Sequence, residues 1–297
     1  MTRFIPILLL LVAAPAQAKP TLRIAFGDEV AAWVDPISVK VTARPLFDEL
    51  AGSAGYSYSL AFLRGPELQR RIEAGTIDLG FASLSDFIEV SRRSEVKPLV
   101  TGLTLGRKWF KLLLLVREGT FGSLKQLKDR TISTYRGERV QRVFLHVHLA
   151  EKGHGSPQGF FSAVQVKAKP ESPVLDVLMG DADACIVSDV VLAAMSELNP
   201  RLKDKLKVLH ASEPITRLPL FARKGLKTDD VRRLKEVLLK LHTSKKGKQL
   251  LLVFKKQQLA PVTDSDYDSV RRLFRRYDAL TKITKNRVQP KGRRPGI

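Results

Sequence analysis

Polar residues gather in the loops that follow strand-like segments of this sequence, where open α/β sheets bind their ligands. Hydroxyl groups and free backbone amides at helix N-termini suit an anion or a polar solute. Ser, Thr and Asp are also the usual helix caps, so each position has a purely structural alternative. Trp33 has a similar alternative as a core residue. The candidate ligand-binding residues are Asp28, Trp33, Ser83, Ser85, Thr134, Tyr135, Arg136 and Ser188.

Signatures of catalysis are missing from the sequence. There is no P-loop, no Gly-x-Ser-x-Gly elbow and no His-Glu-x-x-His motif. His146 and His148 are two residues apart in an expected helix, a spacing that does not place them on one face. With His154 they would bind a metal only if that segment were not helical. Cys185, the sole cysteine, lies in an apolar run typical of a core residue. We therefore expect no enzyme activity, no metal and no cofactor.

The first 18 residues have the layout of a secretory signal peptide. Arg3 supplies the positive start, Ile5 to Ala14 form an apolar run, and Ala16-Gln17-Ala18 is a small-x-small cleavage site. An apolar run of roughly ten residues is too short for a membrane anchor, which needs about twenty. We expect cleavage after Ala18 and export to the periplasm. No cysteine follows the site to carry a lipid.

The formal net charge of +21 raises the question of nucleic-acid binding. Export argues against it, because exported proteins rarely meet such a substrate, and we expect no nucleic-acid partner. Part of the charge lies at the end of the chain, where 281–297 contain six basic residues and no acidic one. We expect a basic disordered tail at 286–297. Contact of this tail with anionic lipid is an alternative to simple solvation.

Strand-like and helix-like segments alternate along the rest of the chain. Strands are expected at Leu22–Phe26, Ile77–Ala82, Thr131–Thr134 and Ala184–Val187, with amphipathic or capped helices between them. Alternation of this kind predicts an α/β fold whose sheets are largely parallel.

Four local phrases occur in a particular order. They are Ile72–Phe81 with its Glu-Ala-Gly-Thr-Ile-Asp-Leu core, Ser123–Thr131, Val177–Ala184, and Asp266–Val270. Their order and spacing resemble the periplasmic solute-binding proteins of ABC transporters, in particular the phosphate/phosphonate-binding branch with the type 2 periplasmic binding fold. The resemblance spans nearly the whole chain after the signal peptide.

The resemblance implies two α/β lobes, each a mainly parallel sheet flanked by helices, with a ligand cleft between them. Lobe 1 would comprise 19–117 plus 215–285, and lobe 2 would comprise 118–214. The two crossings would run through Lys111–Arg117 and Leu218–Arg223. Hinge closure would bury the ligand, and the closed monomer would deliver it to an ABC permease.

The chain departs from this family at its anion-binding loops. Gly137-Glu138-Arg139-Val140 stands where phosphonate binders carry a Ser-Thr-Ser-Gly type of loop, so hydroxyls are missing and Glu138 would repel an anion. Arg136 or Arg139 would replace them with a bidentate contact. We expect an exported protein that captures a small polar, phosphate- or phosphonate-like anion for an ABC transporter. The alternative is a ligand-sensing accessory protein of a membrane receptor or kinase.

Overall fold

The structure is a computed structural model, and the residues that it describes fall into several ranges. These are 19–27, 37, 41, 44, 47, 48, 52, 55–93, 96–137 and 139–288, with only the backbone described for 283–288. The expected signal peptide, Asp28, Trp33 and Glu138 lie outside the described residues, as does 289–297.

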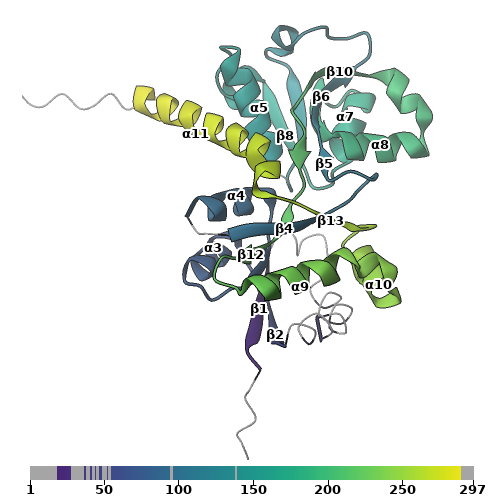
Figure 1. Ribbon diagram of the computed structural model, residues 1–297. Coiled ribbons are helices and arrows are strands. Elements are labelled where there is room, and N and C mark those ends of the chain that lie inside the picture. Colours follow the sequence, from purple (N-terminus) through teal and green to yellow (C-terminus); the bar gives the residue numbers. More distant parts are fainter. Residues whose placement is uncertain are drawn as a thin grey trace, which may run out of the picture.

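A six-stranded sheet forms the first lobe (Figure 1). Its strand order is β13-β4-β12-β3-β1-β2. The strands are β1 (Thr21–Gly27), β2 (Ser57–Leu63), β3 (Leu79–Phe81), β4 (Val96–Gly102), β12 (Pro219–Arg223) and β13 (Leu259–Pro261). The helices of this lobe are α3 (Gly65–Glu73), α4 (Leu84–Arg93), α9 (Thr228–Leu239) and α10 (Lys245–Val253), with a 3-10 turn at Leu241–Thr243.

Both faces of this sheet are covered, as the side-chain alternation along β1 shows. Ala25 packs in one buried cluster with Leu68 of α3 and Phe87 of α4. Ile24 packs in a second buried cluster with Leu238 of α9 and Leu250 of α10. Successive side chains of a strand point to opposite faces, so α3 and α4 cover one face and α9 and α10 cover the other.

A five-stranded sheet with the order β10-β6-β9-β7-β8 forms the second lobe. Its strands are β6 (Leu112–Arg117), β7 (Thr131–Tyr135), β8 (Ala163–Lys167), β9 (Ala184–Ser188) and β10 (Leu206–Ala211). The helices are α5 (Arg139–Glu151), α6 (Pro157–Phe160), α7 (Ser172–Met179) and α8 (Asp189–Leu198), with 3-10 turns at Leu124–Leu127 and Pro200–Lys205. Cys185 of β9 is fully buried and packs in a cluster with Val174 and Val177 of α7, which confirms its assignment to the core. Burial raises the pKa of its thiol far above the ordinary value.

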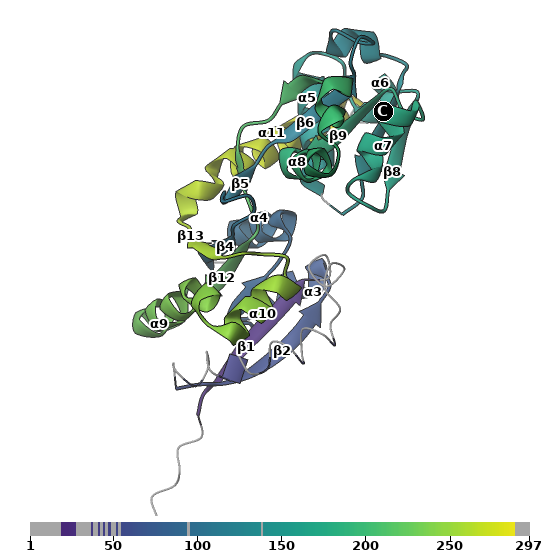
Figure 2. The same ribbon diagram turned by 90° about the vertical axis from the view of Figure 1, so that its right-hand side faces the viewer.

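The chain crosses between the lobes at a short two-stranded ribbon (Figure 2). β5 (Trp109–Phe110) pairs antiparallel with β11 (Ile215–Thr216). We expected the crossings at Lys111–Arg117 and Leu218–Arg223, and the strand pairing corrects this. Leu112–Arg117 is an inner strand of the second sheet, and Pro219–Arg223 is an inner strand of the first. The apolar runs that looked like connections are sheet strands because both of their edges are paired.

The last helix, α11 (Asp268–Val288), follows a 3-10 turn at Asp264–Tyr267 and links the lobes on one side. It leaves the first lobe and runs alongside α5 of the second (Figure 1). Arg276 on α11 forms an ion pair with Glu151 on α5. Asp278 on α11 forms an ion pair with Arg92 on α4, with 2.8 Å between Oδ2 and Nη1. The helix continues three residues into the segment that we expected to be disordered from 286, because its backbone remains helical to Val288.

The two-lobe α/β fold is confirmed, but its sheets are mixed rather than mainly parallel. Among the described strands, β1 pairs parallel with β2 and β3, and β7 pairs parallel with β8 and β9. The pairings that involve β4, β6, β10, β12 and β13 are antiparallel. β6 and β12 enter their sheets directly from the hinge ribbon, so they run against the strands built from consecutive strand–helix units. No helix in the described part of the chain is both long and apolar enough to cross a bilayer.

Candidate ligand-binding site

A cavity of about 150 Å³ extends from the hinge ribbon into the first lobe. We call it the hinge cavity. Both lobes contribute to its wall, since the starts of α4 and α5 both border it, together with the hinge and the layer between the first sheet and α9–α10. Its polar lining residues are Ser83, Ser85, Thr101, Arg139, Arg217, Lys255 and Lys256.

The N-terminus of α4 borders this cavity, because β3 ends at Phe81 beside the cavity and α4 begins three residues later, at Leu84. The Ser83 hydroxyl donates to Asp86 Oδ2 at 2.9 Å and accepts from the Asp86 backbone N–H at 3.1 Å, and this exchange caps the helix. Ser83 and Ser85 are both nearly buried, at 6% and 5% exposure. The first N–H groups of a helix have no acceptor within the helix and carry the positive end of its dipole. This end of α4 therefore favours a negatively charged group.

The N-terminus of α5 borders the same cavity from the second lobe through Gly137, Arg139 and Val140. The Arg139 guanidinium, which belongs to α5, contacts two other helices: Nη1 is 3.9 Å from Glu89 Oε1 on α4, and Cζ stands 5.7 Å from the ring centre of Phe274 on α11. Arg139 is thus a cation held at the junction of the lobes. Two positive helix ends and a guanidinium converge on one cavity.

The hinge adds a second guanidinium. Arg217 follows β11 directly and lies 5.5 Å from the ring centre of Phe110 on the opposite hinge strand. The backbone around it is held firmly, because Tyr267 donates to the Arg217 carbonyl at 3.0 Å and Thr101 donates to the Leu218 carbonyl at 2.8 Å. No aspartate or glutamate is among the described residues that line the cavity. The cationic side chains that line it, those of Arg139, Arg217, Lys255 and Lys256, favour an anion.

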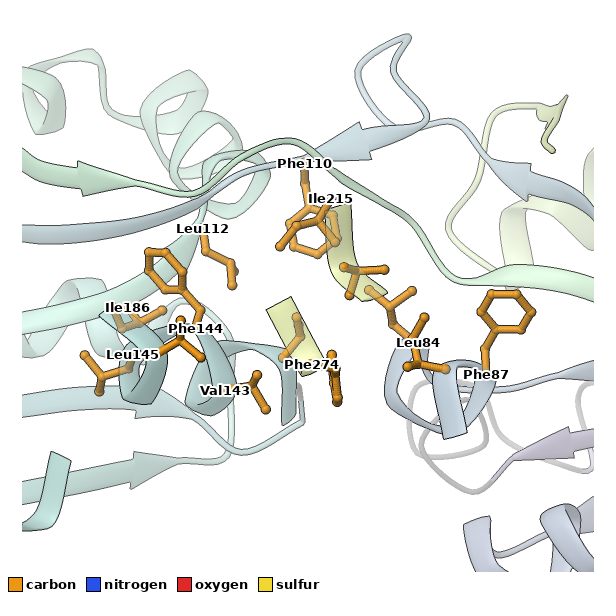
Figure 3. Packing of buried hydrophobic residues seen from close by; sticks show 14 of the residues in the cluster. Leu84, Phe87, Phe110, Leu112, Val143, Phe144, Leu145, Ile186, Ile215 and Phe274 are labelled. Carbon is orange, nitrogen blue, oxygen red and sulfur yellow. The ribbon is translucent and has the colours of Figure 1, made fainter. Parts of the chain in front are cut away.

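The two hinge strands pack against a buried hydrophobic cluster (Figure 3). Phe110 and Ile215 of the two hinge strands lie in one buried cluster with Leu84 of α4, Phe144 of α5 and Phe274 of α11. Because this cluster contains residues of both lobes, the core is continuous across the crossing. The cations of the cavity are positioned by a packed framework.

The expected site residues divide into two groups. Ser83 and Ser85 line the hinge cavity. Thr134, Tyr135 and Ser188 do not line it and make local contacts instead. Thr134 is fully buried and donates to the Gln165 carbonyl at 3.3 Å, the Tyr135 ring packs against Gly137, and the Ser188 hydroxyl caps α8 by accepting from the Val191 N–H at 3.4 Å.

Arg136 also lies outside the lining of the cavity and is exposed. Its backbone extends the β7–β8 ladder by donating to the Lys167 carbonyl at 2.9 Å. Of the two arginines considered from the sequence, Arg139 is the one that borders the cavity.

Asp189, the neighbour of Ser188, has a structural role at the hinge. Its Oδ1 accepts from the Lys111 backbone N–H at 3.0 Å, and its Oδ2 pairs with Arg107 at 3.1 Å. Arg107 in turn lies over the Trp109 ring at 4.4 Å. These contacts fasten the start of α8 to the hinge ribbon, so Asp189 positions the crossing.

Sequence reasoning missed Thr101, Arg217 and the two lysines. Arg217 stands alone between two strand-like segments, and Lys255 and Lys256 follow a helix in a chain that is rich in lysine. No local pattern distinguishes them from surface cations. Among the described residues, no group of three or more His, Cys, Asp or Glu side chains is placed to hold a metal ion.

Two lobes, a double crossing and an anion-favouring cavity beside the hinge define a bilobal ligand-binding protein. The family described as "ABC transporter, phosphonate, periplasmic substrate-binding protein" matches residues 30–267. This chain belongs to that family, as the ordered phrases predicted, and the family assignment favours a transport function over the sensing alternative.

Solved structures agree on the fold. XAC2383 of Xanthomonas citri, bound to chloride, is similar with a TM-score of 0.65 and 18% identity over 90% of this chain and 99% of that one. PhnD1 of Prochlorococcus marinus, in complex with methylphosphonate, is similar with a TM-score of 0.60 and 14% identity over 87% of this chain and 98% of that one. The phosphonate-transporter binding protein PA3383 of Pseudomonas aeruginosa is similar with a TM-score of 0.57 and 14% identity over 91% of this chain and 100% of that one. No curated protein matches the chain in sequence.

Proposed function

We propose that this protein captures a small organic anion of the phosphonate type in the hinge cavity and delivers it to an ABC permease. The observation that carries the proposal is the convergence of the N-termini of α4 and α5, one from each lobe, with Arg139 and Arg217 on one cavity. Phosphonate oxygens would accept from the free helix amides and from the guanidinium groups.

The ligands of similar proteins support an anion. PhnD1 is described in complex with methylphosphonate, and XAC2383 has been solved with chloride and with ATP. Ser83 and Ser85 fit a role in this site because Ser83 caps α4 and Ser85 stands in its first turn. Asp28, Trp33, Thr134, Tyr135 and Ser188 stay candidates for the wider cleft, which opening and closure of the lobes would reshape.

We propose further that the mature protein begins at Lys19 after cleavage at Ala18 and works in the periplasm as a monomer, without a catalytic step, a cofactor or a nucleic-acid partner. Intact-mass measurement of protein from a periplasmic extract tests the cleavage site. Size-exclusion chromatography with light scattering tests the oligomeric state. A mass that retains residues 1–18 or a stable dimer would contradict these two proposals.

The binding proposal is tested by calorimetry and thermal shift of the mature protein with methylphosphonate, phosphate and methanesulfonate, with arginine as a cationic control. A ligand at a hundredfold excess over its dissociation constant stabilises the folded state by about 2.7 kcal/mol. Arg139→Ala should weaken anion binding by about tenfold or more, because a hydrogen bond to a charged group contributes roughly 1.5–3 kcal/mol.

Arg136→Ala is the matched control, since Arg136 is exposed in the same loop and does not line the cavity. Its dissociation constant should equal that of the wild type. The candidate residues selected from the sequence included Arg136 and not Arg139, and the lining of the cavity favours the opposite choice. If none of the three anions binds, or if both variants bind like the wild type, the proposed site is wrong.

A further inference from the structure

Most of the described residues that line the hinge cavity are apolar. Beyond the cationic end, they are mainly aliphatic and aromatic side chains from the first sheet on one side and from α9, α10 and the turn between them on the other, with Lys255 and Lys256 shortly after α10. Leu79 and Leu220 represent the sheet, and Leu238, Leu241 and Leu250 represent the helices. We call this part the apolar chamber.

The side chains of the apolar chamber are themselves well buried. Leu79, Leu220 and Leu241 are 1–3% exposed, and Leu250 is 6% exposed. These leucines therefore lie in the interior of the first lobe, where most of their surface contacts other protein atoms and the free space beside each of them is small. Protein interiors are close-packed and contain few voids larger than a water molecule. A void lined by such groups forfeits dispersion contacts that an apolar guest would restore.

The two ends of the hinge cavity differ in chemistry, and both open into the same space. At one end, Arg139, Arg217 and the start of α4 favour a negative charge. At the other, leucine side chains offer no hydrogen-bond partner to a polar group, so a polar ligand group placed there would lose its hydration without compensation. A ligand that fits both ends has an anionic head and an apolar substituent.

We infer that the ligand is an amphiphilic organic anion, whose phosphonate or similar head lies at the cationic end and whose hydrocarbon substituent enters the apolar chamber. The inference rests on the proposed function and specifies its substrate class. Size limits the substituent: the whole hinge cavity, cationic end included, has a volume of about 150 Å³, close to that of an apolar cavity that stays dry and accepts a guest about the size of benzene. A compact group such as butyl or benzyl is therefore the upper limit, whereas inorganic phosphate leaves the chamber empty.

The affinity should rise with the length of the substituent. Burial of one methylene group from water strengthens binding by about fourfold when its contacts are complete. We therefore expect n-butylphosphonate and benzylphosphonate to bind at least about tenfold more tightly than methylphosphonate. Their heat-capacity change of binding should also be more negative, because that quantity reports apolar burial.

Variants at one position shift this preference in opposite directions. Leu250→Phe reduces the chamber, so it should weaken butylphosphonate binding severalfold and leave methylphosphonate unchanged. Leu250→Ala enlarges the chamber and should shift the optimum towards substituents larger than benzyl. Leu252→Phe is the matched control on the same helix, because Leu252 is 75% exposed and does not line the cavity. Should the phenylalanine variant fail to fold, the alanine variant carries the test.

Isothermal titration calorimetry of the mature protein with methyl-, n-butyl- and benzylphosphonate distinguishes the outcomes. Tighter binding of the larger ligands, altered at Leu250 and unaltered at Leu252, supports the inference. If methylphosphonate binds as tightly as butylphosphonate, the inference is overturned and the proposed function stands. If butylphosphonate binds more tightly but neither Leu250 variant changes this, the substituent lies elsewhere and the inference is again overturned. If none of the phosphonates binds, the proposed function and the inference both fail.

Discussion

Replacement of Asp78 by asparagine should destabilise the first lobe, because this carboxylate joins three segments of it. Asp78 is 4% exposed. Its Oδ2 accepts from the Arg23 backbone N–H at 2.9 Å and from Arg23 Nε at 2.8 Å, while Oδ1 accepts from Arg23 Nη2 at 2.9 Å and from Arg223 Nη2 at 3.0 Å. The residue thus ties β1 and β12 to the turn that precedes β3.

The expected loss can be estimated from the burial of the partners. Removal of one member of a fully buried ion pair costs about 3–5 kcal/mol. The side chains of Arg23 and Arg223 are 37% and 32% exposed, so water recovers part of that loss. We expect about 2–3 kcal/mol for Asp78→Asn. In a protein of this size each 1 kcal/mol lowers the melting temperature by about 2–4 °C.

The effect should depend on pH in a definite direction. Burial by itself would raise the pKa of Asp78, but the hydrogen bonds from Arg23 and Arg223 outweigh it and hold the pKa below its usual 3.8. A carboxyl group whose pKa is lowered by folding stabilises the protein above its unfolded pKa. This contribution is lost as the pH falls through the lower, folded value. The difference between wild type and variant should therefore be full at pH 7 and shrink below about pH 4.

Urea unfolding followed by circular dichroism at pH 7, 5 and 3.5 measures this difference. Asp229→Asn is the control, because Asp229 is 75% exposed and its ion pair with Arg232 among the described residues lies on the surface. Its effect should stay below about 1 kcal/mol. An Asp78→Asn variant as stable as the wild type at pH 7, or a difference that persists undiminished on acidification, would refute the reasoning.

Two further predictions concern the packing of each lobe. Gly80→Ala should lower the free energy of unfolding of the first lobe by about 1–3 kcal/mol in a denaturant titration. A Cβ at this position would stand 2.3 Å from the ring of Phe221, which is only 1% exposed and cannot move away. Gly122→Ala is the control, because the nearest atom to a Cβ there is 3.5 Å away. In the second lobe, burial, with repulsion from His210 and Lys152, lowers the pKa of His148 from 6.5 to about 4. At a pH between these two values the unfolded chain binds a proton at this residue and the folded protein does not. The free energy of unfolding should therefore decrease as the pH is lowered from 6.5 to about 4. His148→Phe, which keeps the aromatic stack, should flatten that part of the stability profile, and an unchanged profile would contradict the assignment.

Local patterns were sufficient to predict the elements that carry the site. The apolar run at Ile77–Ala82 followed by Ser83 and Ser85 predicts a strand that leads into a capped helix, and the structure has β3 and α4 there. The ordered phrases were sufficient for the two-lobe fold and the family. Strand alternation and helix caps are encoded within a few residues, so they can be predicted without tertiary contacts.

The path of the chain between the lobes could not be predicted in the same way. Leu112–Arg117 and Pro219–Arg223 are apolar runs, and an apolar run has the same composition in a crossing as in a sheet. Only the pairing of β6 with β9 and of β12 with β3 and β4 shows that these runs are sheet strands. The crossing itself is the short β5–β11 ribbon.

The composition of the site depended on the same long-range arrangement. Arg136 and Arg139 are three residues apart, and each is a plausible anion contact in the sequence. Arg136 continues the β7–β8 ladder and its side chain is exposed, while Arg139 starts α5 and faces α4 and α11. The sequence by itself therefore determined the lobes, the helix starts and the preference for a polar anion. Tertiary structure alone decided which cations meet and that an apolar chamber lies behind them, because Arg139, Arg217 and Leu250 are brought to one cavity only by the packing of the two lobes.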